Sequence, residues 1–317
     1  MKKISVILSC NGLGDTLSSI PTIRYLYKIY KYNIIVFTYN PSLFKNFSYI
    51  HAYDFDEHVN YSDLDIISTF QIQKNIHPRV DIRQLHARSI GVELLPTEMH
   101  IEYYPDDYIK INNLPEKYVT IHAVQTWPSR TWDTIKWQEL ANKLNNENIK
   151  VVLVGKNESE KGISISYDKP TFKIDNVIDL TNKLSIDQTW HVLNKSEMVI
   201  TMDSGILHLA GSTDSYILQL GSSIDFRFRA PYRKGSQKYK FSYIGGECNL
   251  CCASNLEYAI KFNKRHNNIP PIAFCLERTD SFWKKDNFDE NIYRCHPTVD
   301  RVFNEIIHIY EYYNFKK

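Results

Sequence analysis

The chain has 317 residues, of which 43% are hydrophobic and 23% are charged, as in a folded globular protein and unlike a disordered one. This length favours two domains over one small core. The formal net charge of +2 is too small to indicate a nucleic-acid-binding protein by itself. No apolar run approaches the roughly 18 residues of a membrane span. The charged start precedes only a short apolar run, so we expect a cytoplasmic protein without a signal peptide.

The first hundred residues alternate between apolar runs typical of buried strands and helical patterns. Residues 4–9 and 33–39 predict strands, and residues 15–30 predict a helix between them that tolerates Pro21 early in its length. A strand, a helix and a strand over this length indicate parallel strands with a right-handed crossover. The series continues with a strand at 64–70, a helix at 80–90 and an edge strand at 102–109.

The pattern breaks around residues 111–117, which we take as the boundary between an N-terminal domain (1–114) and a C-terminal domain (115–317). A second α/β series then follows, and residues 298–313 predict a C-terminal helix. Two such series predict two Rossmann-like domains that face a cleft. The second series contains strands at 118–123, 150–154, 177–180, 197–202 and 216–220 and helices at 134–146 and 185–194.

The segment 203–210 (DSGILHLA) follows an apolar strand and begins a short helix. Asp203 or Ser204 can cap this helix through a side-chain oxygen, and a helix N-terminus after a parallel strand is a common phosphate site. Gly205 leaves room for a ligand to approach, and His208 follows one turn later on the same helical face. An ordinary strand–helix junction with a histidine in the core explains the local pattern equally well.

A second candidate is the turn 11–15 (NGLGD), again between a strand and a helix. Its glycines leave backbone amides open to a ligand, although the three-glycine fingerprint of dinucleotide sites is absent. Asp15 points to a general base at the start of the helix. Alternatively, Asp15 only caps the helix and complements its dipole.

Two further loops follow strands of the second series. In the loop 121–132, Arg130 brings a planar cation suited to phosphate, and Gln125 and Thr126 bring neutral donors. A surface arginine stacked on a tryptophan is the alternative. In the loop 155–161, a carboxylate, for which we select Glu158, would accept hydrogen bonds from the ribose or base of a nucleotide. A solvated charged loop is the alternative there.

In order and spacing, the turn at Gly14 and Asp15, Arg130 before Trp132, and the segment 203–210 resemble the bacterial heptosyltransferases. These are inverting GT-B glycosyltransferases of glycosyltransferase family nine. The resemblance implies that Asp15 deprotonates the acceptor hydroxyl and that Arg130, in the place of a lysine, binds the donor diphosphate. It further implies a nucleotide-sugar site near Gln125, Thr126, Asp203, Ser204, Gly205 and His208.

Five of the six cysteines fall between positions 248 and 295, and in a cytosolic protein such a cluster favours metal over disulfides. Cys248, Cys251, Cys275 and Cys295 would make a tetrahedral thiolate site for zinc or iron in a finger spanning 247–297. The segment resembles the cysteine finger of the autotransporter heptosyltransferases, which glycosylate protein serines and carry iron there. A closed four-thiolate site implies a structural role. A set of reduced structural cysteines is the alternative.

Basic and aromatic residues interleave over residues 226–241. Such a surface can follow a polyanion, either DNA or a phosphorylated lipid core. A charged face without a special role is the simpler explanation. The basic members are Arg227, Arg229, Arg233, Lys234, Lys238 and Lys240, joined in the finger by Lys261, Lys264 and Arg265.

We therefore expect an α/β enzyme of GT-B fold, an inverting glycosyltransferase that moves a sugar from a nucleotide-diphosphate donor to an acceptor hydroxyl. The acceptor candidates are a lipopolysaccharide core, a protein hydroxyl and a hydroxylated DNA base. The last of these would make the chain a phage-type DNA glycosyltransferase. An inactive, metal-stabilised nucleic-acid-binding protein is the alternative from another class. The sequence identifies neither the sugar nor the oligomeric state.

Overall fold

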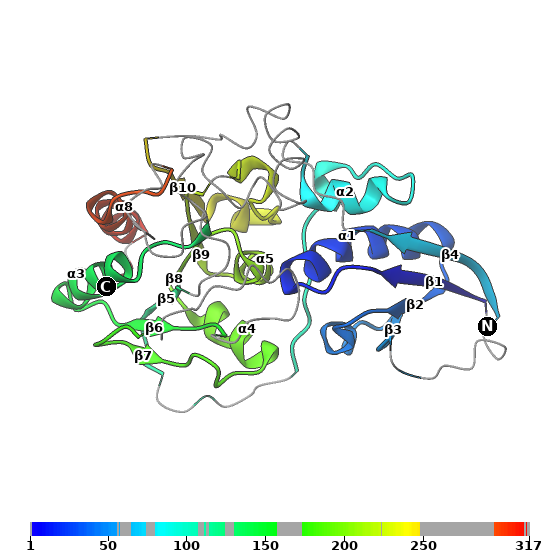
Figure 1. Ribbon diagram of the computed structural model, residues 1–317, viewed down its shortest axis with the longest axis horizontal. Coiled ribbons are helices and arrows are strands. Elements are labelled where there is room, and N and C mark those ends of the chain that lie inside the picture. The colour runs from blue at the N-terminus through cyan, green and yellow to red at the C-terminus, as the bar shows by residue number, and fades with distance from the viewer. Residues whose placement is uncertain are drawn as a thin grey trace, which may run out of the picture.

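The computed structural model describes residues 2–55, 57, 65–73, 80–106, 111, 114–123, 130–156, 173–222, 224–247, 295–313 and 315. These residues form two units, each built on one parallel β-sheet (Figure 1). The strand order of the N-terminal sheet is β3-β2-β1-β4, with a right-handed βαβ connection expected between neighbouring parallel strands. Its strands are β1 (Lys3–Leu8), β2 (Asn33–Phe37), β3 (Ile50–Tyr53) and β4 (Ile66–Ile72).

The C-terminal sheet has six parallel strands in the order β10-β9-β8-β5-β6-β7. Its central strands β5, β8 and β9 are buried at every position, because helices cover both faces of a parallel sheet. The strands are β5 (Val119–His122), β6 (Val151–Leu153), β7 (Ile178–Asp179), β8 (Met198–Thr201), β9 (Tyr216–Leu220) and β10 (Phe241–Ile244).

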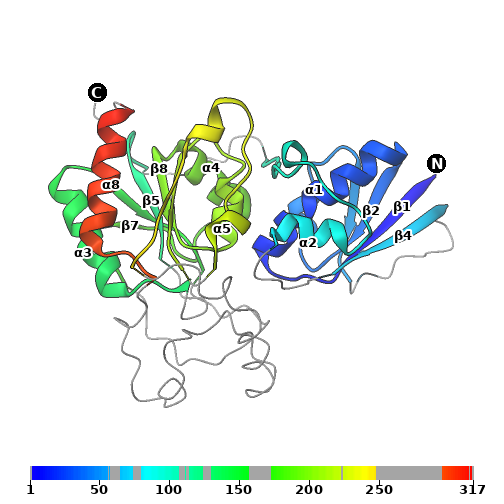
Figure 2. The same ribbon diagram turned by 90° about the horizontal axis from the view of Figure 1, so that it is seen from above.

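Helices cover both sides of the C-terminal sheet (Figure 2). α3 (Thr134–Asn146) and α8 (Val299–Tyr312) pack together on one side. α4 (Ile186–Lys195) and α5 (Gly205–Ala210) lie on the other side, which faces the N-terminal unit. The N-terminal unit adds α1 (Leu13–Tyr30), α2 (Ile82–Arg88) and the short 3-10 helices η1 (Pro41–Phe44) and η3 (Pro96–Glu98), and the C-terminal unit adds η5 (Phe226–Phe228) and η6 (Gly235–Tyr239).

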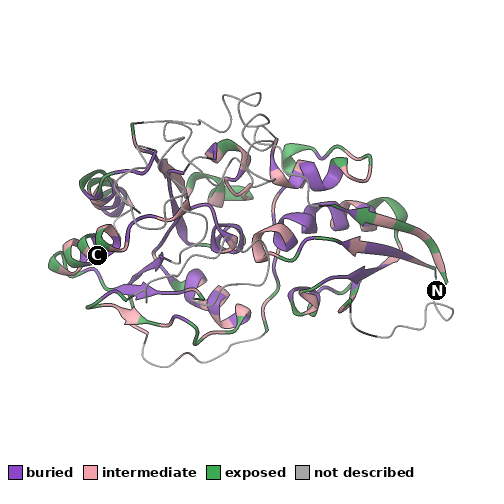
Figure 3. Ribbon diagram, viewed as in Figure 1, coloured by how far each residue is buried: buried purple, intermediate pink, exposed green. Residues whose placement is uncertain are grey.

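α1 joins the two units. It contacts α5 across the junction, and both views show the two helices side by side (Figures 1 and 2). One hydrophobic cluster contains buried residues of both helices, including Leu17 of α1 and Leu207 of α5. In Figure 3, α5 and the part of α1 that follows its first residues are largely purple, as buried residues are drawn. The first turn of α1 is therefore held against the start of α5 by a shared core.

α1 continues through Pro21, which lies in the middle of the helix and not early in its length as expected from the sequence. A proline there removes the backbone hydrogen bond to the carbonyl of Leu17. The continuous burial of Leu17, Ile20, Ile23 and Leu26 outweighs that loss, since tertiary packing of one helix face supplies most of a helix's stability.

The predicted edge strand at 102–109 is wrong for its described part, because residues 101–106 form no strand. Their side chains instead bridge the two units. The Tyr103 hydroxyl donates to Asp187 of α4, and Glu102 pairs with Lys234 at 2.9 Å. β3 and β10 are strands that we did not predict. In the described part of the chain, no helix is both long and apolar enough to cross a membrane.

Candidate functional site

The turn between β1 and α1 places Asp15 in the first turn of the helix. Gly12 occupies the N-cap position without a side-chain hydrogen bond, so the interpretation of Asp15 as the cap is wrong. A Cβ atom on Gly12 would come within 3.1 Å of Asp15 Oδ2, so glycine gives the carboxylate room to turn back toward the start of the helix. An acidic side chain there is stabilised by the helix dipole.

His86 of α2 is the neighbour of Asp15 that sequence reasoning missed. It is 1% exposed, and its Nδ1 lies 3.3 Å from the carbonyl oxygen of Gln73. Burial lowers the pKa of His86, and the nearby Asp15 opposes that shift. Its Nε2 has no hydrogen-bond partner among the described residues. As the fifth residue of an ordinary amphipathic helix, His86 gives no signal in the sequence that it lies beside Asp15.

The second junction lies between β8 and α5. Ser204, and not Asp203, caps α5, since its Oγ accepts a hydrogen bond from the Leu207 amide at 3.4 Å and lies 3.1 Å from Thr201 Oγ1. Asp203 is thereby released from capping, and its carboxylate is 2% exposed. A buried carboxylate needs a cationic partner.

Two arginines supply that partner. Nη1 of Arg130 lies 3.3 Å from Asp203 Oδ2 and 3.3 Å from the Asp203 carbonyl oxygen, and Nε of Arg229 lies 3.8 Å from Oδ2. Burial raises the pKa of Asp203, but the two guanidinium groups and His208 outweigh burial and hold that pKa below its usual value. Asp203 is therefore ionised, and it fixes Arg130 at the end of the sheet.

A third arginine completes what we call the junction charge cluster, made of Asp81, Arg83, Arg130, Asp203 and Arg229. Asp81 caps α2 and pairs with the fully buried Arg83. Arg83 donates to the Ala230 carbonyl of the other unit at 2.8 Å, and its guanidinium lies 4.6 Å from the Tyr232 ring centroid. Burial lowers the pKa of Arg229. The nearby Asp81 acts to raise that pKa, and Arg83 acts to lower it. Three cations and two anions thus gather where the units meet.

The two junctions pack directly on each other through glycines. A Cβ atom on Gly205 would come within 2.9 Å of Leu13 Cβ, and one on Gly14 within 3.0 Å of His208 Cδ2. The space beside Gly205, which we expected a ligand to use, is occupied by Leu13. Gly205 therefore permits close approach of the two helices. A contact between Gly205 and the donor stays a prediction.

His208 lies at the centre of this contact and is 2% exposed. Burial lowers its pKa to about 4, although the nearby Asp203 acts in the opposite direction. The imidazole is thus neutral at pH 7, and its Nδ1 has no hydrogen-bond partner among the described residues. A neutral imidazole can still donate or accept a hydrogen bond to a ligand.

Several predicted site residues lie outside the described residues: Gln125, Thr126, Glu158, Cys248, Cys251 and Cys275. Cys295 is described and buried, and its carbonyl oxygen accepts a hydrogen bond from the Gly246 amide at 2.8 Å just before α8. Within the described ranges, no three His, Cys, Asp or Glu side chains gather as a metal site would require. The predicted thiolate site therefore stays a prediction.

The basic run at 226–241 is largely used inside the molecule. Arg227 pairs with Asp225, and Arg229 is buried at Asp203. Arg233 donates to the backbone carbonyls of Thr213 and Lys240. Arginines committed to internal partners contribute little to a phosphate-tracking surface. The expected polyanion surface thus loses Arg229 and Arg233, whereas Arg227 remains 63% exposed beside Asp225.

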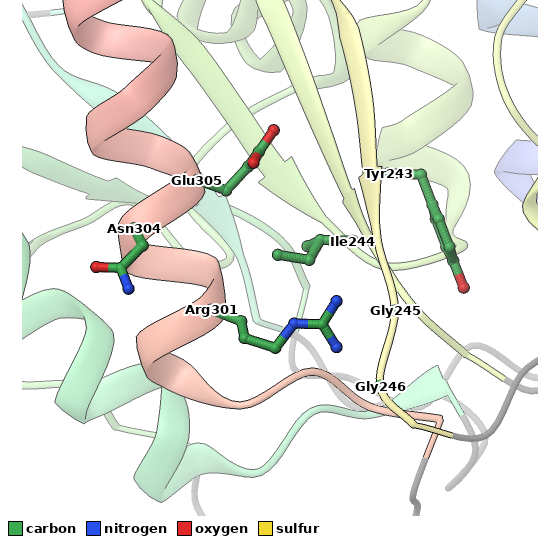
Figure 4. A pocket seen from close by; sticks show the side chains of 7 residues that line it. All are labelled: Tyr243, Ile244, Gly245, Gly246, Arg301, Asn304 and Glu305. Carbon is green, nitrogen blue, oxygen red and sulfur yellow. The ribbon is translucent and has the colours of Figure 1, made fainter.

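A cavity of about 570 Å³ lies between β10 and α8 (Figure 4). Arg301 and Glu305 of α8 face Ile244 and the Gly245–Gly246 backbone across it. None of the predicted donor or base residues lines this cavity. It is therefore separate from the junction charge cluster.

Comparisons with known proteins identify the family. Residues 48–239 match glycosyltransferase family 9 (heptosyltransferase). No curated protein matches the chain significantly. The chain resembles the crystal structure of TibC, a bacterial iron-containing dodecameric glycosyltransferase from enterotoxigenic E. coli, with 15% identity and a TM-score of 0.58 over 78% of this chain and 64% of TibC. The chain thus spans less than two thirds of the length of TibC.

Two other solved structures share the fold. A family 9 glycosyl transferase from Veillonella parvula matches at 13% identity and a TM-score of 0.55, over 87% of this chain and 94% of that one. E. coli ADP-heptose lps heptosyltransferase II matches at 14% identity and a TM-score of 0.50, over 76% and 90%. The α/β fold with parallel sheets is therefore that of the GT-B heptosyltransferases, and the family match extends over more than half of the sequence. This chain belongs to glycosyltransferase family 9 (heptosyltransferase).

Proposed function

We propose that this chain is an inverting glycosyltransferase that moves a sugar from a nucleoside-diphosphate donor to an acceptor hydroxyl. Asp15 is the base and Arg130 binds the donor diphosphate. The observation that carries the proposal is the direct packing of the Asp15 turn on the α5 junction, where Asp203 positions Arg130. A base on one side and a cation on the other are the two groups that such a displacement needs.

The chemistry of the step is simple. The acceptor hydroxyl loses its proton to the Asp15 carboxylate as its oxygen bonds to the anomeric carbon. The bond from that carbon to the diphosphate oxygen breaks at the opposite face, so the configuration inverts. The leaving diphosphate gains negative charge, which Arg130 stabilises through a charge-assisted hydrogen bond. Asp203, held by Arg229, keeps Arg130 in place.

On this proposal, residues 1–114 bind the acceptor and residues 115–317 bind the donor. The TibC structure in complex with ADP-D-beta-D-heptose supports a nucleotide-activated heptose as the first donor to test. A lipopolysaccharide core, a protein hydroxyl and a hydroxylated DNA base are the acceptors to compare.

The full chain should be incubated with ADP-heptose, UDP-glucose or GDP-mannose and each acceptor class. Mass spectrometry should find one acceptor that gains a single sugar mass, with release of an equal amount of nucleoside diphosphate. Proton NMR of the anomeric centre then gives the stereochemistry, and a retained configuration contradicts inversion. Calorimetry that detects binding of none of the nucleotide sugars contradicts the donor assignment.

We also propose that Cys248, Cys251, Cys275 and Cys295 hold one structural zinc or iron ion. The cysteine spacing supports this, and TibC is itself iron-containing. Elemental analysis of the purified chain should give about one metal ion per chain, falling after Cys295→Ser. A metal-free protein of unchanged thermal stability contradicts the site.

A further inference from the structure

Two exposed aromatic rings lie together on the N-terminal unit. Tyr39 is 56% exposed and Phe55 is 36% exposed, and their ring centroids are 4.6 Å apart with an interplanar angle of 52°. Behind them, Phe37 and Tyr53 stack at 5.9 Å, and Phe37 is buried in the core. We call Tyr39 and Phe55 the aromatic platform. Its base is fixed by packing, and its outer faces remain in water.

The platform lies at the edge of the sheet where α/β proteins bind ligands. Tyr39 follows β2 and Phe55 follows β3, and these neighbouring strands are parallel, so both residues stand at the carboxyl edge of the sheet. Ligands of open α/β sheets bind outside this edge. The Asp15 turn follows β1, the next strand along the same edge.

A side-chain amide ties the platform to the Asp15 turn. Nδ2 of Asn40, the residue after Tyr39, donates to the Asn11 carbonyl at 2.9 Å and lies 3.3 Å from Thr16 Oγ1. Thr16 is the neighbour of Asp15 in sequence. With consecutive Cα atoms 3.8 Å apart, these links place the Cα atoms of Tyr39 and Asp15 within roughly 17 Å. A short oligosaccharide can span that distance.

The charge beside the platform argues against a polyanion. The described residues that follow the four strands of this sheet are 9–12, 38–40, 54–55, 57 and 73, and these include Asp54 and Glu57 but no lysine or arginine. Glu57 is held to Asp54 by a backbone hydrogen bond of 3.2 Å, so both carboxylates stay in the loop that carries Phe55. These two carboxylates would repel a phosphate of DNA or of a phosphorylated lipid placed beside Phe55.

Polar side chains flank the rings in sequence. Asn40 follows Tyr39, and Asp54, which precedes Phe55, has a carboxylate that can accept hydrogen bonds from hydroxyls. Apolar ring faces combined with a few polar groups suit a ligand with an apolar face and a polar edge. A pyranose ring has this form, with C–H groups on one face and hydroxyls around its rim.

We propose that the aromatic platform is the acceptor subsite and that the acceptor is an uncharged saccharide, whose ring lies on Tyr39 and Phe55. This inference rests on the proposed function, since it gives the sugar transfer its acceptor class. The saccharide hydroxyl oxygen bonds to the anomeric carbon of the donor, its proton passes to Asp15, and the nucleoside diphosphate leaves.

The test is binding of the full chain to an array of neutral, phosphorylated and sulfated glycans, with a dT oligomer and serine-rich peptides as further probes. Wild type should bind neutral glycans. Tyr39→Ala and Phe55→Ala should each weaken that binding about tenfold, and Tyr39→Trp should retain it. Tyr312→Ala, which removes an exposed aromatic from α8 in the other unit, is the matched control and should leave binding unchanged.

Binding only to phosphorylated glycans, to the dT oligomer or to the peptides overturns the proposal, as does equal neutral-glycan binding by Tyr39→Ala and wild type. Calorimetry with ADP-heptose separates this inference from the proposed function. Donor binding that is intact in Tyr39→Ala, with neutral-glycan binding lost, supports both. Neutral-glycan binding by a chain that binds no nucleotide sugar supports the platform and removes the transferase.

Discussion

The two strand–helix junctions have the same local architecture but treat their carboxylates in opposite ways. After β8, Asp203 is buried between Arg130 and Arg229, and Ser204 caps the helix. After β1, Asp15 is half-buried in the first turn of a helix whose N-cap is a glycine, beside a histidine whose pKa is lowered by burial. One carboxylate holds two arginines, to which the proposed function assigns the donor phosphate, and the other is the carboxylate that it assigns to proton transfer. Two helix starts of the same architecture thus differ through the side chains that neighbouring loops and helices of their own unit bring to the carboxylate.

The largest expected effect comes from neutralising the carboxylate after β1. Asp15→Asn keeps the shape of the side chain and removes the base, so we expect transfer to fall by roughly 10²- to 10⁴-fold. Donor binding should persist, because the cations of the other junction are untouched. Steady-state assays of nucleoside diphosphate release and calorimetry with ADP-heptose measure the two effects.

Glu311→Gln is the matched control, since it removes an exposed carboxylate of α8, away from both junctions and from the aromatic platform. It should retain the wild-type rate constant for transfer. An Asp15→Asn variant that transfers sugar at the wild-type rate would show that the base lies elsewhere.

The pH dependence of the unfolding free energy tests whether His208 is buried between the two junctions. Burial lowers the pKa of His208, and that of His122 at the end of β5, from 6.5 to about 4. Between these values the unfolded chain binds protons that the folded chain does not, so the free energy of unfolding falls as the pH drops from 6.5 to 4. Each histidine should account for about 3 kcal/mol of that fall.

Urea denaturation at several pH values tests this. His208→Gln should flatten the dependence of the unfolding free energy on pH below 6.5 by about 3 kcal/mol, and His122→Gln by a similar amount. Both variants together should flatten it further. A His208→Gln variant with the wild-type slope would mean that its imidazole is exposed to water and not packed between the two helices.

Much of this fold could be predicted from the sequence, because buried parallel strands and amphipathic helices carry strong local patterns. Helix 134–146 was predicted at the same bounds as the observed Thr134–Asn146. The predicted edge strand at 102–109 failed because Tyr103 and Glu102 are used for partners 84 and 132 residues away in sequence. Local alternation cannot reveal such partners.

The candidate site also contains residues that the sequence indicates and residues that it does not. Asp15 and the segment 203–210 stand at recognisable turns, whereas Arg83 and His86 come from an ordinary helix. Arg229 was grouped with a surface run, yet it is 6% exposed. Its ionic partner is Asp203, which lies 26 positions earlier in the sequence but only 3.8 Å away in the fold. Contacts of this kind are set by the tertiary packing of segments distant in sequence, for which a single sequence has no local signal.

Variants of Arg130 test whether the junction after β8 binds the donor diphosphate. Arg130→Ala removes one charge-assisted contact to the diphosphate, so we expect the Kd for ADP-heptose to rise about 10- to 100-fold. Arg130→Lys keeps the charge without the planar fork and should lie between this variant and wild type. Calorimetry measures both.

The matched control is Arg88→Ala, because Arg88 is an exposed arginine whose partner, Glu93, is also on the surface. Its loss should leave the Kd unchanged, since exposed ion pairs contribute little. If Arg130→Ala binds the donor as tightly as wild type does, the Asp203–Arg130 pair is structural. Arg130 would then not bind the donor diphosphate.

The smallest effect concerns the packing that brings the junctions together. In Gly205→Ala, the new Cβ atom would come within 2.9 Å of Leu13 Cβ, so the two helices must move apart. Overpacking of this kind costs about 1–3 kcal/mol of unfolding free energy, which urea denaturation measures. Gly91→Ala is the comparison, because its added Cβ has no neighbour within 4 Å and only its left-handed backbone is strained. Transfer should fall in Gly205→Ala and not in Gly91→Ala, because separating the helices also separates Asp15 from Arg130. A Gly205→Ala variant with unchanged stability and transfer would mean that the base and the cation do not depend on contact between the two turns.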